Sequence, residues 1–382
     1  MLDELLREMI ATTSSDLHLK VGRPPLMRRQ GELKPTEHPP LTEEQVREML
    51  FSMMSERQQQ RFERDWEIDL AYHLPGEARF RVNGYYQRGH VSAALRLIPE
   101  QVPTIDELTL PEVMKELALR KQGLILITGP TGSGKSTSQA AMIEHINRSQ
   151  DRHIVTIEDP VEYVFTDRRA TIDQREVGSD TRSHKEALRR VLRQDPDVIL
   201  MGEMRDPETI EIGLHAAETG HLVFSTLHTN DAKQTVDRIL DTIGSDMLTQ
   251  YRSMLSLNLM AVLSQRLLPR ADGSGRVAAM EVMINSPHVA ELIHDGKTIE
   301  LQNAIATSKS YYKMQTFNQA LTRLVQEGLV TAEVALEFSD APGDLRLMLR
   351  GVGTGAAAAT TKEEAEPEPG KQKTSTVRGF EF

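Results

Sequence analysis

The sequence contains no cysteine among its 382 residues, which excludes disulfides and thiolate metal sites and is compatible with a reducing compartment. Aromatic residues make up only 4%, so few side chains could stack on the bases of a single-stranded nucleic acid. No apolar run approaches the length of a membrane span. The first residues, Met1–Arg7, mix charges and lack the apolar core of a signal peptide. We therefore expect a cytoplasmic protein.

The composition is that of a globular protein, with 39% hydrophobic and 26% charged residues. The length is sufficient for two domains. The formal net charge of −11 argues against sequence-independent nucleic-acid binding, which depends on basic surface. We accordingly expect no nucleic-acid partner.

Residues 1–98 are predicted to form a small mixed domain. Apolar residues at helical spacing predict a helix over Leu2–Thr12, and alternation predicts a strand over Ser15–Val21. Thr42 is a candidate N-cap for a second helix. Repeated alternation between Ile68 and Leu97, interrupted by turn residues, predicts an antiparallel sheet.

The next part of the chain alternates strands and helices, which predicts a mainly parallel sheet with covered faces. Residues 99–122 would form a linker and a helix, and 123–270 the core of this second domain. Residues 271–351 would be mostly helical, because the pattern from Met247 to Arg350 is helical apart from a strand at Arg276–Ile284. The tail, 352–382, has a composition that predicts disorder. The predicted strands before this region are Leu124–Thr128, His153–Glu158, Asp197–Met201 and His221–Leu227.

A full GxxxxGK[ST] motif follows the first of these strands and precedes a predicted helix. Its glycines let backbone N–H groups surround a phosphate, and the helix adds the positive end of its dipole. Lys135 would reach the β- and γ-phosphates, and the Ser136 hydroxyl would hold Mg²⁺. The chain is therefore predicted to bind a nucleoside triphosphate, with ATP and Mg²⁺ as cofactors. The predicted binding residues are Gly129, Pro130, Thr131, Gly132, Ser133, Gly134, Lys135, Ser136 and Thr137.

An apolar strand ends in Glu203, the position from which P-loop proteins reach the Mg²⁺ site. Gly202 occupies the place where many of these proteins carry the metal-side Asp. Glu203 could hold Mg²⁺ through a water or polarise the attacking water. Asp197 begins the same strand, at the opposite end, and is interpreted as structural.

A second acidic group, Glu158 and Asp159, lies at the end of the preceding strand and comes before Pro160. Open α/β sheets bind ligands at the carboxyl ends of their strands. A carboxylate there could orient and deprotonate water beside the γ-phosphate.

Thr226, His228 and Thr229 end a further strand, where a γ-phosphate sensor would lie. His221 begins that strand and could contact either the nucleotide or a neighbouring subunit. Arginines suited to stabilise the transition state are Arg79, Arg81 and Arg96 in the N-terminal sheet. Arg189, Arg190 and Arg193 are typical of a solvated helix face.

Together with Ser15–Leu19, these clusters closely resemble the type IV pilus retraction ATPases, the PilT/PilU branch of the secretion ATPase superfamily. The resemblance extends from Met1 to about Gly351. Gly129–Ser136 matches the Walker A loop and Thr156–Glu162 the Asp box. Asp197–Arg205 matches an atypical Walker B motif, and Gly220–His228 matches the His box.

The resemblance implies an α/β fold in which a PAS-like α+β domain precedes a RecA-like P-loop ATPase domain with a helical C-terminal region. It implies a homo-hexamer with ATP bound between the two domains. In such a protein ATP drives the rotation of one domain relative to the other. It implies Glu158 as general base, Glu203 as the Mg²⁺-side acid and His228 as the second histidine of the His box. Arg81 and Arg96 would reach the nucleotide when the site closes.

The implied function is pilus retraction, or twitching motility, through the inner-membrane platform protein at the base of the pilus machine. The protein would be peripheral to the membrane only through partners, among which a paralogous retraction ATPase is possible. Residues 288–295 keep only part of the AIRNLIRE motif of PilT proteins. A PilU-like accessory ATPase is therefore an alternative, as is a non-catalytic ring that binds ATP. A pilus extension or type II secretion ATPase would usually carry a tetracysteine zinc module, and a RecA-like nucleic-acid translocase conflicts with the acidic charge.

Overall fold

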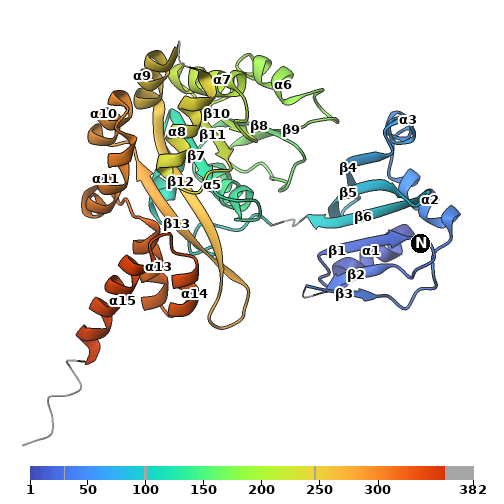
Figure 1. Cartoon of the computed structure of the whole chain (residues 1–382). Coiled ribbons are helices and arrows are strands. Elements are labelled where there is room, and N and C mark those ends of the chain that lie inside the picture. Colours follow the sequence, from blue (N-terminus) through green and yellow to red (C-terminus); the bar gives the residue numbers. More distant parts are fainter. Residues whose placement is uncertain (30, 99–100, 245–246, 358–382) are drawn as a thin grey trace, which may run out of the picture.

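The computed structural model describes residues 1–29, 31–98, 101–244 and 247–357, which form two bodies, each built on its own β-sheet (Figure 1). The N-terminal sheet has the strand order β3-β2-β1-β6-β5-β4, and all its neighbouring strands are antiparallel. Helices and sheet enclose one apolar core that includes Leu5, Phe62 and Phe80. The elements are α1 Leu2–Ala11, β1 Asp16–Lys20, β2 Leu26–Arg29, β3 Glu32–Pro35, α2 Glu43–Ser52, α3 Glu56–Asp65, β4 Glu67–Leu74, β5 Ala78–Gln87 and β6 His90–Ile98.

Local sequence determines these elements, and the predictions for them are confirmed. Helix α1 buries the apolar stripe that predicted it. Thr42 is the N-cap of α2, where it forms a capping box with Gln45. The predicted antiparallel sheet between Ile68 and Leu97 is the β4–β5–β6 meander.

The second sheet has the order β13-β12-β7-β11-β10-β8-β9. Its pairs are parallel except for β12 with β13. One face packs against α4 and α5, and the other against α6 to α11, so both faces are buried. The first elements are α4 Val113–Ala118, β7 Gly123–Thr128, α5 Lys135–Ser149, β8 His153–Glu158, β9 Thr171–Glu176, α6 His184–Val191, β10 Val198–Met201, α7 Pro207–Glu218 and β11 Leu222–Leu227. They are followed by α8 Ala232–Ile243, α9 Leu248–Asn258, β12 Leu259–Pro269, β13 Arg276–Ile284, α10 Pro287–Asp295, η2 Thr298–Glu300, α11 Leu301–Thr307, α12 Lys309–Tyr312, α13 Phe317–Gln326, α14 Ala332–Glu337 and α15 Pro342–Ala357.

The prediction that residues 247–350 contain a single strand is wrong. Helix α9 passes directly into β12 at Leu259, with no glycine or proline to mark the change. Val262 packs on one face of the sheet and Leu263 on the other, so the first part of the strand, 259–263, is apolar at every position. Such a continuous apolar pattern does not distinguish a buried strand from a buried helix. The edge strand β9 was also missed, because its sequence is mostly polar and only β8 pairs with it.

At two of the predicted boundaries the regular structure continues across the boundary. The boundary between 270 and 271 falls in the turn that joins the paired strands β12 and β13. Helix α15 runs to Ala357, past the predicted start of a disordered tail at 352. The rest of that predicted tail, 358–382, lies outside the described residues.

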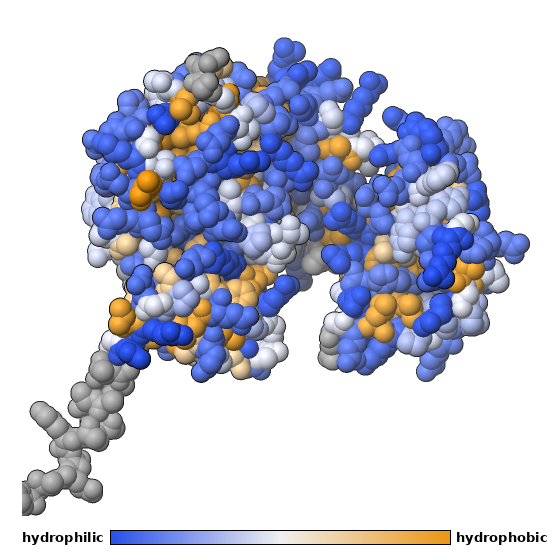
Figure 2. Space-filling model, in the orientation of Figure 1, coloured by the Kyte–Doolittle hydropathy of each residue, from blue (hydrophilic) through white to orange (hydrophobic). Residues whose placement is uncertain are grey.

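The surface of both bodies is mostly hydrophilic on the face that Figure 2 shows, with apolar side chains in scattered groups. Trp66, Leu257, Ile299 and Tyr311 are the most exposed of the large apolar side chains, each more than two-thirds exposed. Within the described ranges, no helix is both long and apolar enough to span a membrane.

Candidate active site

The GxxxxGK[ST] motif joins the end of β7 to the start of α5, as the sequence predicts. Strand β7 lies inside the sheet between β11 and β12, and all its residues are buried. The loop therefore follows a fully buried strand inside the sheet, and the first turn of α5 directs its free N–H groups toward the loop.

Strand β12 contacts this loop through Gln265. Gln265 donates to the carbonyl of Ser133 at 2.7 Å and accepts from the hydroxyl of Ser138 at 2.7 Å. Gly129 has a φ of 143°, and a Cβ atom there would lie 2.3 Å from the Gln265 carbonyl oxygen. Sequence reasoning missed Gln265 because it placed this segment in a helix.

Lys135 donates to the carbonyl oxygens of Gly129 and Pro130 at 2.8 and 3.1 Å. Burial lowers the pKa of its ammonium group, and the carboxylates of Glu203 and Glu162 oppose this shift. The ammonium thus lies at the mouth of the loop, within the electrostatic reach of two acids.

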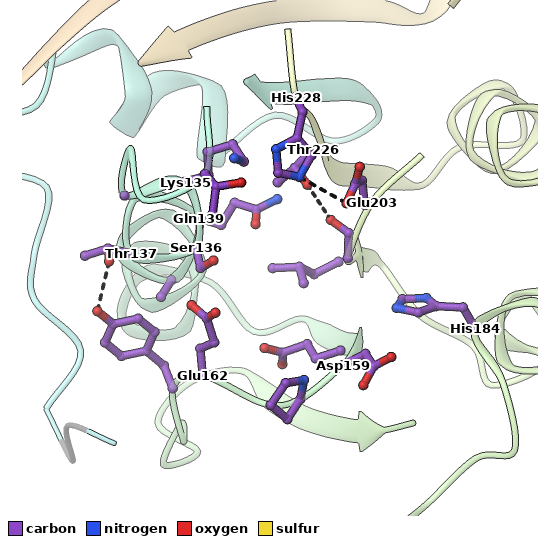
Figure 3. Close-up of a pocket in the computed structure, with 18 of the residues that line it drawn as sticks. Lys135, Ser136, Thr137, Gln139, Asp159, Glu162, His184, Glu203, Thr226 and His228 are labelled. Carbon is purple, nitrogen blue, oxygen red and sulfur yellow. Dashed lines mark hydrogen bonds and ion pairs between the residues drawn. The ribbon is translucent and has the colours of Figure 1, made fainter. Parts of the chain in front are cut away.

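A cavity of about 720 Å³ opens in front of the loop (Figure 3). Of the predicted binding residues, Thr131, Gly132, Gly134, Lys135, Ser136 and Thr137 line it. Gly129, Pro130 and Ser133 are not among its lining residues and instead shape the loop behind it. Residues that the sequence did not single out also line the cavity, among them Gln139, Tyr163, Phe165, His184, Leu267 and Arg276.

Glu158 lies at the end of β8 and lines this cavity. Its Oε1 accepts from the Thr156 hydroxyl at 2.7 Å and from the Gln174 amide at 3.2 Å. Burial raises the pKa of this carboxyl, and the two hydrogen bonds oppose the rise only in part. A raised pKa makes the carboxylate a stronger base than an exposed one.

Glu203 follows β10 and lines the same cavity. Its Oε2 accepts from Arg205 at 2.8 Å and lies 3.3 Å from Nε2 of His228 (Figure 3). The Thr226 hydroxyl donates to the Gly202 carbonyl at 2.7 Å, which ties the ends of β10 and β11 together. The structure thus brings Glu203, Thr226 and His228 together, as their places at strand ends predict.

Gly202, where many P-loop proteins have an aspartate, lies against His184. A Cβ atom on Gly202 would be 3.0 Å from two ring atoms of His184. Burial lowers the pKa of this imidazole. The absence of a side chain at 202 thus makes room for a histidine that the sequence analysis did not consider.

The other predicted residues lie away from the cavity in this chain. Arg81 and Arg96 are register partners on β5 and β6, and Arg96 donates to Asp16 at 2.8 Å. His221 bonds the Ala216 carbonyl at 2.9 Å, at the end of the sheet where β11 begins. Asp197 accepts from the backbone N–H of His153, which confirms its structural interpretation.

A buried carboxyl, Glu281 on β13, supports the turn that carries His228. It is 1% exposed and accepts from the backbone N–H of Ala232 at 2.9 Å and from the Gln302 amide at 3.3 Å. Burial raises its pKa from 4.5 to about 7, and the nearby carboxylates of Asp231 and Asp340 add to the rise.

We expect Glu281→Gln to change the pH dependence of the free energy of unfolding. The unfolded chain loses this proton near 4.5, whereas the folded chain keeps it up to about 7. Folding therefore takes up a proton between these values, and stability falls as the pH rises through them. Relative to wild type, the variant should gain up to about 3 kcal/mol between pH 4.5 and 7.5, measured by urea unfolding. If the free energy of unfolding depends on pH equally in the two proteins, the raised pKa of Glu281 would be contradicted.

A phosphate-binding loop at the carboxyl edge of a mainly parallel sheet, faced by carboxylates from β8 and β10 of the same sheet, is typical of a P-loop ATPase. The sequence profile of the family described as "Type II/IV secretion system protein" matches residues 1–337, and the chain belongs to this family. The α/β fold class predicted from the sequence is confirmed.

The particular relatives are pilus motors. The type IV pilus retraction ATPase PilT of Pseudomonas aeruginosa is 45% identical over 339 residues, which cover 89% of this chain and 98% of PilT. The type IV pilus ATPase PilU of the same organism is 44% identical, covering 91% of each chain. A crystal structure of the pilus retraction motor PilT with bound ADP superposes with a TM-score of 0.84 at 46% identity, covering 91% of this chain and 99% of that one. The predicted resemblance and the prediction of an ATPase are confirmed.

Proposed function

We propose that this chain is an ATP-hydrolysing motor that powers type IV pilus retraction from the cytoplasmic side of the inner membrane. In this proposal it works as a homo-hexamer on the platform protein of the pilus. One observation carries the proposal: Lys135 and Ser136 share a single cavity with Glu158 and Glu203, in a chain that matches PilT over nearly its whole length. The domain division at 98, 122, 270 and 351 stays a prediction.

Each residue has a proposed chemical role. Lys135 exchanges the loop carbonyls for β- and γ-phosphate oxygens. Ser136 and Glu203 hold Mg²⁺, Glu203 through a water. Glu158 orients and deprotonates the attacking water, and His228 positions Glu203 through their contact.

The residues present fit a magnesium ion that arrives with the nucleotide. Within the described ranges, no three acidic or histidine side chains gather closely enough to hold a metal by themselves. Mg²⁺ commonly takes one or two protein oxygens and completes its shell with phosphates and waters. A hydroxyl and a carboxylate on one cavity meet that requirement, and Mg²⁺ would supply charge stabilisation on the phosphates.

The charges that line the cavity also support a site that is completed when the two domains close on each other. Its lining has the basic residues Lys135, Lys185, Arg205 and Arg276 and the acidic residues Glu158, Asp159, Glu162, Glu203 and Asp206. Arg205 and Lys185 are already paired with acids of this group. Triphosphate hydrolysis needs further positive charge, which Arg81 and Arg96 would bring when the domains close.

An accessory retraction ATPase is the second candidate, because identity to PilU nearly equals identity to PilT. Such a chain would act beside a paralogous motor. Both candidates predict ATP binding and a ring.

Expression in a piliated bacterium that lacks its own retraction ATPases tests the function. A primary motor restores twitching alone, whereas an accessory ATPase restores it only beside a second retraction ATPase. If the chain is expressed at normal levels and restores twitching neither alone nor beside a second retraction ATPase, a role in retraction would be contradicted. Salt-sensitive DNA binding by the purified chain would instead favour a nucleic-acid translocase.

A further inference from the structure

Glu176, at the end of β9, is a buried carboxylate that bonds to three parts of the chain. Its side chain is 5% exposed. Oε2 accepts from Arg79 at 2.6 Å and from the backbone N–H of Val161 at 3.0 Å. Oε1 accepts from the Ser179 hydroxyl at 3.4 Å. A buried charge of this kind is stable only when its partners stay in place.

Strand β9 holds the turn that follows Glu158. Glu158 and Glu176 are register partners in the parallel pair β8–β9. On the same strand, the amide of Gln174 donates to Glu158 Oε1 and to the Tyr163 carbonyl, at 3.2 and 2.8 Å. Side chains of β9 thus form hydrogen bonds with residues 158, 161 and 163 of one turn. Glu176 accepts the bond from residue 161, in the middle of that turn.

Arg79 comes from a different body of the protein. It lies on β5 in the N-terminal sheet, 97 positions from Glu176 in the sequence. Figure 1 shows β9 on the side of the ATPase sheet that faces the N-terminal sheet. The Arg79 side chain is 26% exposed, so its guanidinium is largely withdrawn from water at this contact. The same charge that balances Glu176 therefore depends on where the N-terminal body lies.

We propose that Arg79 and Glu176 form a clasp through which the position of the N-terminal domain controls the order of the Glu158 turn. With Arg79 in contact, Glu176 is fixed and holds the Val161 amide, so Glu158 keeps one orientation. When the N-terminal domain moves and Arg79 leaves, the buried carboxylate loses its cation and turns toward water. The turn is then released. Glu176 is a positioning residue in this scheme, which rests on the proposed role of Glu158 in hydrolysis.

Hydrogen exchange and steady-state hydrolysis, measured on the full chain, test the clasp. In Arg79→Ala we expect exchange at the Val161 amide to rise about tenfold, because its acceptor is no longer held. We expect kcat to fall about tenfold with little change in KM, since a base displaced by a fraction of an ångström loses rate and not substrate affinity. Arg79→Lys keeps the positive charge, so its exchange rate at Val161 and its kcat should lie between those of wild type and Arg79→Ala.

Two further variants separate the clasp from general effects. Arg7→Ala removes a comparable arginine of the N-terminal body, one that pairs with Glu77 at 2.8 Å and is 58% exposed. It should leave exchange and kcat unchanged. Glu176→Gln keeps an acceptor for Val161 but loses the charge, so adding Arg79→Ala to it should have no further effect.

Unchanged exchange at Val161 in Arg79→Ala would overturn the clasp, as would equal effects of Arg7→Ala. Raised exchange with wild-type kcat would overturn its control of hydrolysis. The exchange measurement does not depend on which residue is the base, and Glu158→Gln tests that role separately. Failure of the clasp and failure of the proposed function are therefore distinguishable.

Discussion

Glu158→Gln is expected to abolish steady-state ATP hydrolysis while ATP remains bound. The amide keeps the shape of the carboxyl and the hydrogen bond from Thr156, so the cavity should be unchanged. It cannot accept a proton from water, and loss of a general base lowers kcat by about 10²- to 10⁴-fold. Phosphate release with purified chain and saturating MgATP measures the rate, and equilibrium binding of a fluorescent nucleotide measures affinity.

The pH profile gives an independent readout of the same residue. A base must be deprotonated, and burial raises the pKa of Glu158. The kcat of wild type should therefore fall on the acid side at a higher pH than an exposed glutamate would produce. The residual activity of Glu158→Gln should lack this decrease.

Glu162→Gln is the matched control, since it makes the same change on an exposed side chain of the same turn. We expect it to lower kcat far less than Glu158→Gln. Turnover by Glu158→Gln close to the wild-type rate would exclude this residue as the base and transfer the role to Glu203. An inactive wild-type chain that still binds ATP would favour the accessory function.

Lys135→Ala is expected to have the second large effect. The lysine is the only basic residue of the phosphate loop, and its ammonium already bonds the loop carbonyls. Charge-assisted bonds to phosphate are strong, and loss of such a group in a pocket lowers kcat by about 10²- to 10³-fold. Nucleotide affinity should fall as well, because the bond exists in the bound ground state.

Lys185→Ala serves as its control, because Lys185 lines the same cavity but pairs with Glu208 at 3.3 Å. We expect the affinity for MgATP to change little there. Near-normal hydrolysis by Lys135→Ala would show that the loop lysine does not contact the transferred phosphate, and would contradict the proposed site.

Much of the site was predictable because its signals are local. The spacing in Gly129–Ser136 specifies a loop between a strand and a helix within a few residues. Glu158, Glu203 and His228 lie at or just after the ends of apolar strands, and the carboxyl ends of parallel strands meet at one edge. The shared cavity follows from these facts once the strands are recognised.

Other residues were not predictable, since no local pattern marks them. Gln265 lies in a segment whose apolar pattern suits a helix or a strand equally well. Gln139 and His184 look like ordinary helix residues until the sheet places them on the cavity. The location of Arg81 and Arg96 outside the cavity depends on the arrangement of two bodies, which no sequence motif encodes.

The sequence by itself determined the phosphate loop, the acids at the strand ends and the family, because each rests on residue types at short, fixed spacing. Only the tertiary structure decided what holds these groups in place. Gln265 under the loop, Glu281 under the His228 turn and Arg79 on Glu176 join residues 49 to 132 positions apart. Such contacts form when sheets and domains pack, and packing selects from many partners that local sequence leaves equally open.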